Sequence, residues 1–226
     1  MQLTIDTSTD TASIAIIQNS EVLAELVWCC QQNHTVELLP RLAQLLNDTE
    51  VALQSITCII VAKGPGSFTG LRVGISTAKG LALSLGIPII GISTLEVEAY
   101  QHAETGLPIC PIFNAGRAEI ATAMYQKKNN KWCQLVAEHI TTVDTLCFQI
   151  TTKTVFCGEF TSTIATQLKK QLKQRAVILP SGTQSCRARF LAELGLKRLE
   201  AGDYDDPATL QPLYLRHPQI TESKHR

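Results

Sequence analysis

The sequence predicts an α/β protein of two duplicated lobes, each with the element order βββαβα. Its 226 residues and 45% apolar content suffice for two modest cores, because single domains usually contain about 100–150 residues. The same succession of strand-like and helix-like runs occurs on both sides of a polar stretch at 100–107, which is typical of a duplication. We therefore expect a first lobe over 1–103 and a divergent second lobe over 104–226, whose C-terminal tail can return to the first.

The first lobe opens with three antiparallel strands and continues with alternating helices and strands. Apolar and β-branched runs, with leucines at helical spacing, predict strands at 2–6, 12–17 and 22–28, a helix at 35–47, a strand at 55–62, a helix at 69–85 and a strand at 88–92. Pro40 falls in the second turn of the first helix, where we expect it to bend the helix or delay its start.

The second lobe repeats this order with little sequence identity to the first. Similar patterns predict strands at 109–114, 119–125 and 132–138, a short helix at 142–149, a strand at 154–157, a helix at 162–174 and a strand at 176–179. Two such lobes facing each other across a cleft resemble the RNase H-like architecture of the actin, hexokinase and Hsp70 superfamily. That resemblance implies that the first hairpin of each lobe points toward nucleotide phosphates or their metal.

A nucleotide site of this kind is expected to be eroded in this chain. The candidate remnant of a phosphate-binding hairpin consists of Asp6, Thr7, Ser8 and Thr9. The matching hairpin of the second lobe offers Asn114, a neutral amide where a carboxylate would organise magnesium-bound water. A paired-glycine adenosine loop is expected near 180–186, and that segment supplies one glycine. We therefore expect no strongly bound cofactor, with ATP or ADP bound only in an assembled complex.

Charge and targeting features of the sequence bear on what the protein binds and where it is located. Lys plus Arg and Asp plus Glu number 20 each, so the chain has no broad positive field for unaided nucleic-acid binding. The sequence starts without a basic leader and has no window of about 18 uncharged apolar residues. We therefore expect a cytoplasmic protein that does not contact a membrane and that reaches any RNA through a partner.

The eight cysteines are scattered along the chain. They form no C-x-x-C pair and no nearby Cys/His grouping in sequence that closes a zinc tetrahedron. We expect reduced core thiols and no metal site. Cys29 and Cys30 are adjacent at a strand end, and adjacency alone does not indicate redox chemistry.

The glycine-rich segment GPGSFTGLRVGISTAKGLALSLG at 64–86 fits no phosphate-binding or nucleophile motif. Its spacing fails the patterns G-x-x-x-x-G-K-[ST], G-x-G-x-x-G and G-x-S-x-G. Instead, small residues recur every four positions, at Gly70, Gly74, Ala78 and Ala82. Two glycines inside a helix cost about 1 kcal/mol each relative to alanine, so close packing must compensate. The partner in that packing is either the lobe's own sheet or a neighbouring helix, and the free N–H groups at the helix start are an alternative anion site.

Four stretches closely resemble the bacterial TsaB family, also called YeaZ. They are IDTSTDTASIAI at the start, HTVELLPRLAQLL (34–46), GPGSFTGLRVGISTAKGLALSLGIPIIGISTLE (64–96) and PLYLR (212–216). The resemblance is dense over the first hundred residues and thinner beyond. It implies a subunit of the machinery that makes N6-threonylcarbamoyladenosine in tRNA. In that machinery TsaB is a scaffold that binds TsaD, TsaD transfers threonylcarbamoyl from its adenylate to the adenosine beside the anticodon, and TsaE docks where the pair meets.

The family's partner surface implies an interface on the two first-lobe helices. The expected partner-interface residues are His34, Val36, Leu39, Leu42, Leu46, Gly70, Leu71, Arg72, Gly74, Ile75, Ala78 and Ala82. Without the partner we expect homodimerisation through the same face, and we expect tRNA to be reached only through the complex. No catalytic residue and no metal ligand is expected, because Thr94 and Glu98 occupy the positions of the two metal-binding histidines of TsaD.

Two other functions remain open at this point. The first is a stand-alone ATP-binding kinase or ATPase of the same superfamily, which micromolar binding of magnesium-ATP would favour. The second is a metallopeptidase-like protein, although the chain has no H-E-x-x-H motif. The substitution Gly74→Leu separates the two explanations of the small-residue helix. It should abolish partner binding if the stripe is a surface and unfold the protein if the stripe packs internally.

Overall fold

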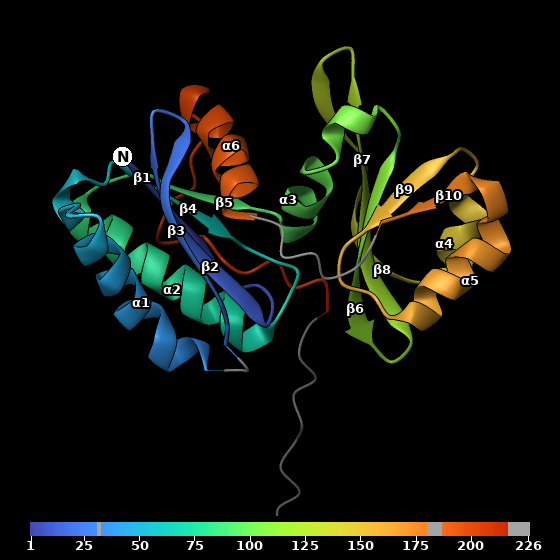
Figure 1. The fold of residues 1–226 in the computed structure, drawn as a ribbon, viewed down its shortest axis with the longest axis horizontal. Helices are drawn as coiled ribbons and strands as arrows, with labels where there is room; N and C mark the ends of the chain where they lie inside the picture. Colours follow the sequence, from blue (N-terminus) through green and yellow to red (C-terminus); the bar gives the residue numbers. More distant parts are fainter. Residues whose placement is uncertain (31–32, 180–186, 217–226) are drawn as a thin grey trace, which may run out of the picture.

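The computed structural model describes residues 1–30, 33–179 and 187–216. Two mixed sheets of five strands each lie side by side (Figure 1), with strand orders β3-β2-β1-β4-β5 and β10-β9-β6-β7-β8. Read in the opposite direction, the second order is β8-β7-β6-β9-β10, which is the arrangement of the first sheet. The predicted duplication of an α/β lobe is therefore confirmed.

The first lobe follows the predicted order of elements closely. It contains β1 (Gln2–Asp6), β2 (Thr11–Gln18), β3 (Glu21–Cys29), α1 (His34–Asp48), the 3-10 turn η1 (Leu53–Ser55), β4 (Cys58–Ala62), α2 (Phe68–Leu85) and β5 (Ile89–Ile92). β1 pairs antiparallel with β2 and parallel with β4. Because helices cover both faces of this sheet, β4 is buried throughout, as parallel strands usually are.

The second lobe begins after two connecting segments, α3 (Thr94–Tyr100) and η2 (Ala103–Thr105). Its elements are β6 (Ile109–Gly116), β7 (Glu119–Lys128), β8 (Lys131–Thr142), α4 (Val143–Gln149), β9 (Thr154–Cys157), α5 (Ser162–Leu172), η3 (Lys173–Arg175) and β10 (Ala176–Ile178). A last helix, α6 (Arg187–Glu200), follows. The helices α3 and α6 were not predicted from the sequence.

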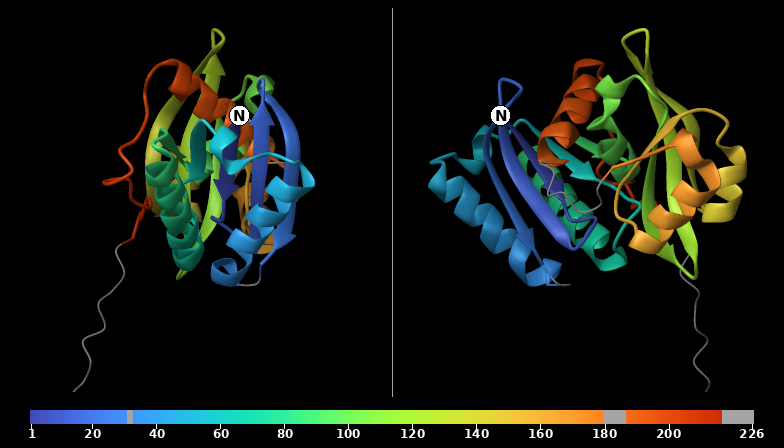
Figure 2. Two further views of the ribbon diagram at one scale, coloured as in Figure 1. Left: turned by 90° about the vertical axis from the view of Figure 1, so that its left-hand side faces the viewer. Right: turned by 45° about the vertical axis from the view of Figure 1, so that its right-hand side comes forward.

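The helices form an inner and an outer layer. α1 and α2 cover one face of the first sheet, and α6 covers the other through Ala188, Leu191 and Ala192. α4 and α5 cover the outer face of the second sheet, whereas α3 packs on its inner face. The two views of Figure 2 show α1 and α2 on the side of the molecule that faces away from the second lobe.

The C-terminal part of the chain packs on the first lobe. α6 lies against the first sheet, and Asp205 N donates to Ile89 O at 2.9 Å. Leu213 N donates to Lys63 O at 2.6 Å. The expected return of the chain therefore involves a whole helix and the segment after it, because sheet faces left bare by α1 and α2 need an apolar cover.

Pro40 neither delays nor divides α1, which begins at His34 and runs through it. Both Pro40 and Val36 lie on the exposed side of the helix. The carbonyl of Val36, whose partner would be the missing N–H, is therefore open to water, which reduces the cost of an internal proline. Among the helices described in 1–30, 33–179 and 187–216, none combines the length and apolar character needed to cross a bilayer.

Candidate functional site

The first hairpin, between β1 and β2, directs its polar groups inward. Asp6, Thr7, Ser8 and Thr9 are all buried. Asp6 Oδ1 accepts hydrogen bonds from the Ser8 amide at 2.9 Å and from Ser8 Oγ at 2.6 Å. Thr7 Oγ1 donates to the carbonyl of Gly70 at 2.7 Å. The hydroxyls expected to face a phosphate are therefore bound within the protein.

Arg187, the first residue of α6, closes this hairpin from the inner side of the lobe. Its Nε lies 3.2 Å from Asp6 Oδ2 as an ion pair without hydrogen-bond geometry. Nη2 donates to Thr9 Oγ1 at 2.6 Å and to Thr11 O at 3.1 Å, and Nη1 lies 3.6 Å from Glu159 Oε1 of the second lobe. Burial alone lowers the pKa of the guanidinium, but Asp6, Glu159 and Glu98 outweigh it and raise the pKa above its usual value. A protein cation thus pairs with the carboxylate that a nucleotide-bound metal would approach.

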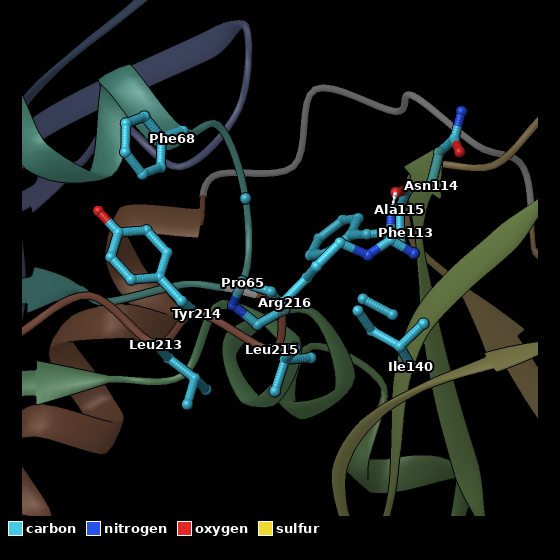
Figure 3. A pocket seen from close by; sticks show the side chains of 12 residues that line it. Pro65, Phe68, Phe113, Asn114, Ala115, Ile140, Leu213, Tyr214, Leu215 and Arg216 are labelled. Carbon is cyan, nitrogen blue, oxygen red and sulfur yellow. Dashed lines mark hydrogen bonds between the residues drawn. The ribbon is translucent and has the colours of Figure 1, made fainter. Parts of the chain in front are cut away.

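Asn114, at the matching place in the second lobe, is bound to its own turn. Its Oδ1 accepts a hydrogen bond from the Gly116 amide at 2.9 Å. It also lines a cavity of about 200 Å³ between the lobes, together with Phe68, Phe113 and Tyr214 (Figure 3). The expected glycine loop at 180–186 lies outside the described residues.

The small-residue stripe of α2 faces the lobe's own hairpin. A Cβ at Gly70 would overlap the carbonyl of Thr7 and approach the ring of His34, and a Cβ at Gly74 would overlap Thr7 Oγ1. Ala78 and Ala82 are buried in the same core. The stripe therefore packs against the lobe's own hairpin and β1, and the approach of a foreign subunit along it stays a prediction.

His34 belongs to the same packed hairpin. It is 1% exposed, and its Nε2 lies 2.9 Å from Cys30 Sγ and 3.1 Å from Thr9 O. Burial raises the pKa of the Cys30 thiol. This histidine therefore anchors the start of α1 to the hairpin, and its expected contact with a partner stays a prediction.

Of the expected interface residues, only three are exposed: Val36 (68%), Leu39 (56%) and Arg72. Leu46 is half-buried. The remaining residues, which lie in the core or against the hairpin and are closed to a partner, are His34, Leu42, Gly70, Leu71, Gly74, Ile75, Ala78 and Ala82. Helical periodicity fixed which side chains share a face, but it could not show which face meets the sheet.

The outward faces of α1 and α2, on the side opposite the small-residue stripe, form a surface that we call the outer helix face. It consists of Val36, Leu39, Pro40 and Ala43 on α1 and of Thr69, Ser76, Gly80 and Leu83 on α2. A Cβ at Gly80 would meet nothing within 4 Å. On the α2 part of this face, the small residues that are open to a neighbouring helix are therefore Thr69, Ser76 and Gly80.

Comparisons with known proteins identify the family. A family model described as "TsaD: tRNA N6-adenosine threonylcarbamoyltransferase" matches residues 28–224. TsaB of Bacillus subtilis is 37% identical over 217 residues, which cover 95% of this chain and 93% of that protein. The chain belongs to the TsaB family. With it, the chain belongs to the wider TsaD-like family that the model describes.

Further TsaB relatives agree with this assignment. TsaB of Escherichia coli is 35% identical over 130 residues, covering 57% of this chain and 56% of that protein. The solved structure of YeaZ from Pseudomonas aeruginosa has a TM-score of 0.78 at 23% identity and covers 95% of this chain and 99% of that chain. At this identity the likeness shows the fold, and the two-lobed fold of this TsaB-family chain is the predicted one.

Arg72 is exposed, but it already has aromatic partners within this TsaB-family chain. Its guanidinium lies 3.9 Å from the centroid of the Phe68 ring, and its Nε donates to Tyr214 Oη at 2.9 Å. Figure 3 shows the Phe68 and Tyr214 rings facing each other. The PLYLR motif thus fastens the C-terminal segment to the start of α2.

We expect the isolated protein to bind magnesium-ATP no more tightly than millimolar. Arg187 already forms an ion pair with the Asp6 carboxylate, and the hydroxyls of Thr7 and Ser8 are bound internally. Isothermal titration calorimetry measures this directly. A dissociation constant in the low micromolar range would instead favour the kinase or ATPase alternative.

Proposed function

We propose that this chain is a non-catalytic scaffold subunit that binds TsaD through the outer helix face and activates it. Membership of the TsaB family, whose members are named as tRNA threonylcarbamoyladenosine biosynthesis proteins, supports a place in that pathway. TsaD would then transfer threonylcarbamoyl from its adenylate to the adenosine beside the anticodon. The observation that carries the proposal is the uncovered outer helix face.

The outer helix face has the composition of a helix-packing surface. More than half of the accessible area is exposed at Val36, Leu39 and Leu83. Burial of apolar side chains of this size against a partner is favourable. Between them the open positions at Ser76 and Gly80 allow a second helix to approach α2 closely. Two helices from each partner can bury an interface of standard size, about 1,600 Å² in total.

The state of the first hairpin supports a non-catalytic role. Catalysis of phosphoryl transfer in this fold would need a carboxylate free to hold a metal and hydroxyls free to contact phosphates. Here Asp6 pairs with Arg187, and Thr7 and Ser8 bond internally. We infer that the chain contributes a surface, and that TsaD supplies the chemistry.

The other assemblies that we propose follow from the family resemblance. A helix face that is apolar and open can pair with a second copy of itself, so homodimerisation is the proposed state when TsaD is absent. TsaE would dock where TsaB and TsaD meet, and tRNA would be held by the assembled complex.

The substitution Leu39→Asp is expected to weaken binding of TsaD by about 30-fold or more. A charge at the centre of an apolar interface costs about 2 kcal/mol or more, which corresponds to that factor. Because Leu39 is 56% exposed in the free chain, the variant should fold normally. Calorimetry with purified TsaD gives the dissociation constant, and circular dichroism checks the fold.

Phe148→Asp is the matched control for this measurement. Phe148 lies on α4 in the second lobe and is 87% exposed. It removes more exposed apolar area than Leu39→Asp but lies away from the outer helix face. Equal weakening by both substitutions, or weakening by Phe148→Asp alone, would place the partner elsewhere.

A further inference from the structure

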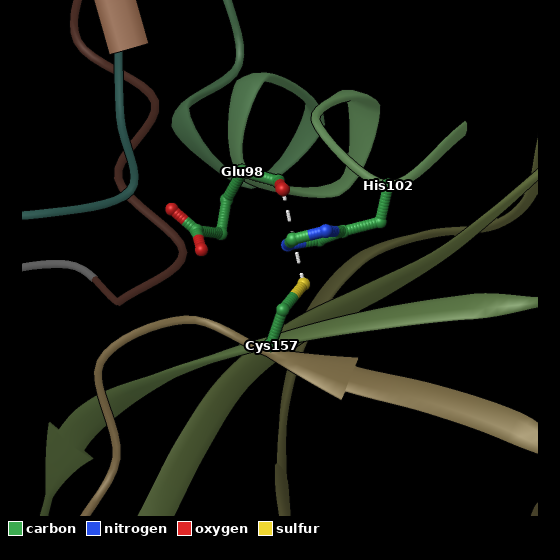
Figure 4. A group of neighbouring side chains, drawn as sticks. All are labelled: Glu98, His102 and Cys157. Carbon is green, nitrogen blue, oxygen red and sulfur yellow. Dashed lines mark hydrogen bonds between the residues drawn. The ribbon is translucent and has the colours of Figure 1, made fainter. Parts of the chain in front are cut away.

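Three potential metal ligands from distant parts of the chain converge where α3 meets the second sheet (Figure 4). Glu98 belongs to α3, His102 follows it by four residues, and Cys157 ends β9. One ligand atom of each lies within 4.8 Å of the other two. No such grouping was expected from the sequence, because Cys157 lies far along the chain from the other two.

We propose that Glu98, His102 and Cys157 bind one zinc-class divalent cation, with water as the fourth ligand. A carboxylate, an imidazole and a thiolate together favour zinc and its borderline-soft relatives over magnesium or calcium. Three protein ligands leave one position of a tetrahedron open. Binding releases one proton, from the Cys157 thiol to solvent, because the thiolate is the ligand.

The local structure holds these side chains close to a coordinating arrangement. The four-residue spacing puts Glu98 and His102 on the same side of the chain as it leaves α3. Bond lengths to zinc of about 2.0–2.3 Å require ligand atoms about 3.3–3.6 Å apart, so side-chain shifts of about 1 Å would close the site. Cys157 Sγ now makes only a weak 3.8 Å contact with the Glu98 carbonyl.

The hydrogen bonds around the proposed site leave the His102 ring available to a cation and orient Glu98. Among the described residues, none forms a hydrogen bond with the His102 ring, so its ring nitrogens are available to a metal. Gln101 Nε2 donates to Glu98 Oε2 at 3.4 Å and helps to orient that carboxylate.

The proposed ion would tie together the junction of the two lobes. α3 follows β5 of the first sheet, whereas its Leu95 and Ala99 pack in one cluster with Cys157 of the second. A metal held by α3 and β9 would therefore stiffen the junction. Zinc should accordingly raise the melting temperature of the full chain, because a ligand that binds only the folded state stabilises it.

The test is a cobalt(II) titration of the full-length reduced chain, followed by absorption spectroscopy. We expect a near-ultraviolet thiolate-to-cobalt band that saturates at one equivalent and disappears when zinc is added. Cys157→Ala should abolish the band. His102→Gln, at a half-buried position, should weaken cobalt binding by at least tenfold.

Cys30→Ala is the control, because Cys30 and His34 form a second Cys–His pair whose Sγ and Nε2 lie 2.9 Å apart. The proposal predicts that this variant keeps the full cobalt band. The absence of a saturable band in the parent chain would overturn the proposal. So would a band that survives both Cys157→Ala and His102→Gln, or one that is lost with Cys30→Ala.

Discussion

Replacing Arg187 by methionine is expected to lower the free energy of unfolding by about 3–5 kcal/mol, the usual cost of removing one partner of a buried ion pair. Asp6 is 1% exposed and Arg187 is 7% exposed. Without the guanidinium, Asp6 Oδ2 would be a buried charge with no cation beside it, and Thr9 Oγ1 would lose its donor. Urea unfolding followed by circular dichroism measures the change.

Arg189→Met is the matched control on the same helix. Arg189 pairs with Glu193 one turn along α6 at 3.0 Å, and its side chain is 66% exposed. Such exposed pairs contribute about 0.5 kcal/mol or less.

Adding Asp6→Asn to Arg187→Met should recover part of the lost stability, because a buried amide costs less than a buried unpaired charge. A loss at Arg187 no larger than at Arg189 would show that the pair does not close the hairpin.

Replacing Gly74 by alanine is expected to destabilise the protein by about 1–3 kcal/mol, although alanine favours helices. The added Cβ would overlap Thr7 Oγ1 and lie 3.6 Å from Ile5 Cγ2. Overpacking of this kind costs about 1–3 kcal/mol, and the bond from Thr7 to the Gly70 carbonyl would be disturbed as well. The larger Gly74→Leu should therefore unfold the chain. Urea unfolding again gives the value.

Gly80→Ala, in the same helix, should have the opposite sign. A Cβ at Gly80 meets nothing within 4 Å, so the substitution gains the helix propensity of alanine, about 1 kcal/mol. Comparing Gly74→Ala with Gly80→Ala therefore contrasts the inner face of α2 with its outer face within one helix. Equal effects of the two substitutions would contradict the packing described for the small-residue stripe.

Local patterns predicted most of the fold, but they did not predict which face of α2 packs against the sheet. Gly70, Gly74, Ala78 and Ala82 share one face whatever that face meets, so their spacing alone could not distinguish a sheet from a partner. The neighbouring positions decide the question: they place Ser76 and Gly80 outward and bury the stripe against β1. The exposed Val36 and Leu39 were predicted as interface residues, and their contact with TsaD stays a prediction.

Contacts between distant segments could not be predicted from the sequence. Arg187 meets Asp6 across almost the whole chain, and no local motif marks an arginine at the start of a helix as an ion-pair partner. α6 was missed although Ala188, Leu191 and Ala192 recur at helical spacing. That these residues cover the first sheet could not be read from local sequence. An eroded nucleotide site was predicted from Asn114 and stays a prediction, whereas the closure of the hairpin by Arg187 was found only in the structure.

The most direct test of the central claim, that this chain acts by presenting the outer helix face to TsaD, is threonylcarbamoyl transfer to tRNA in a reconstituted reaction supplied with threonylcarbamoyl-adenylate. We predict no transfer by this chain alone, transfer when it is combined with TsaD, and a strong loss with Leu39→Asp but not with Phe148→Asp. Transfer by this chain alone, or undiminished transfer by TsaD without it, would contradict the claim.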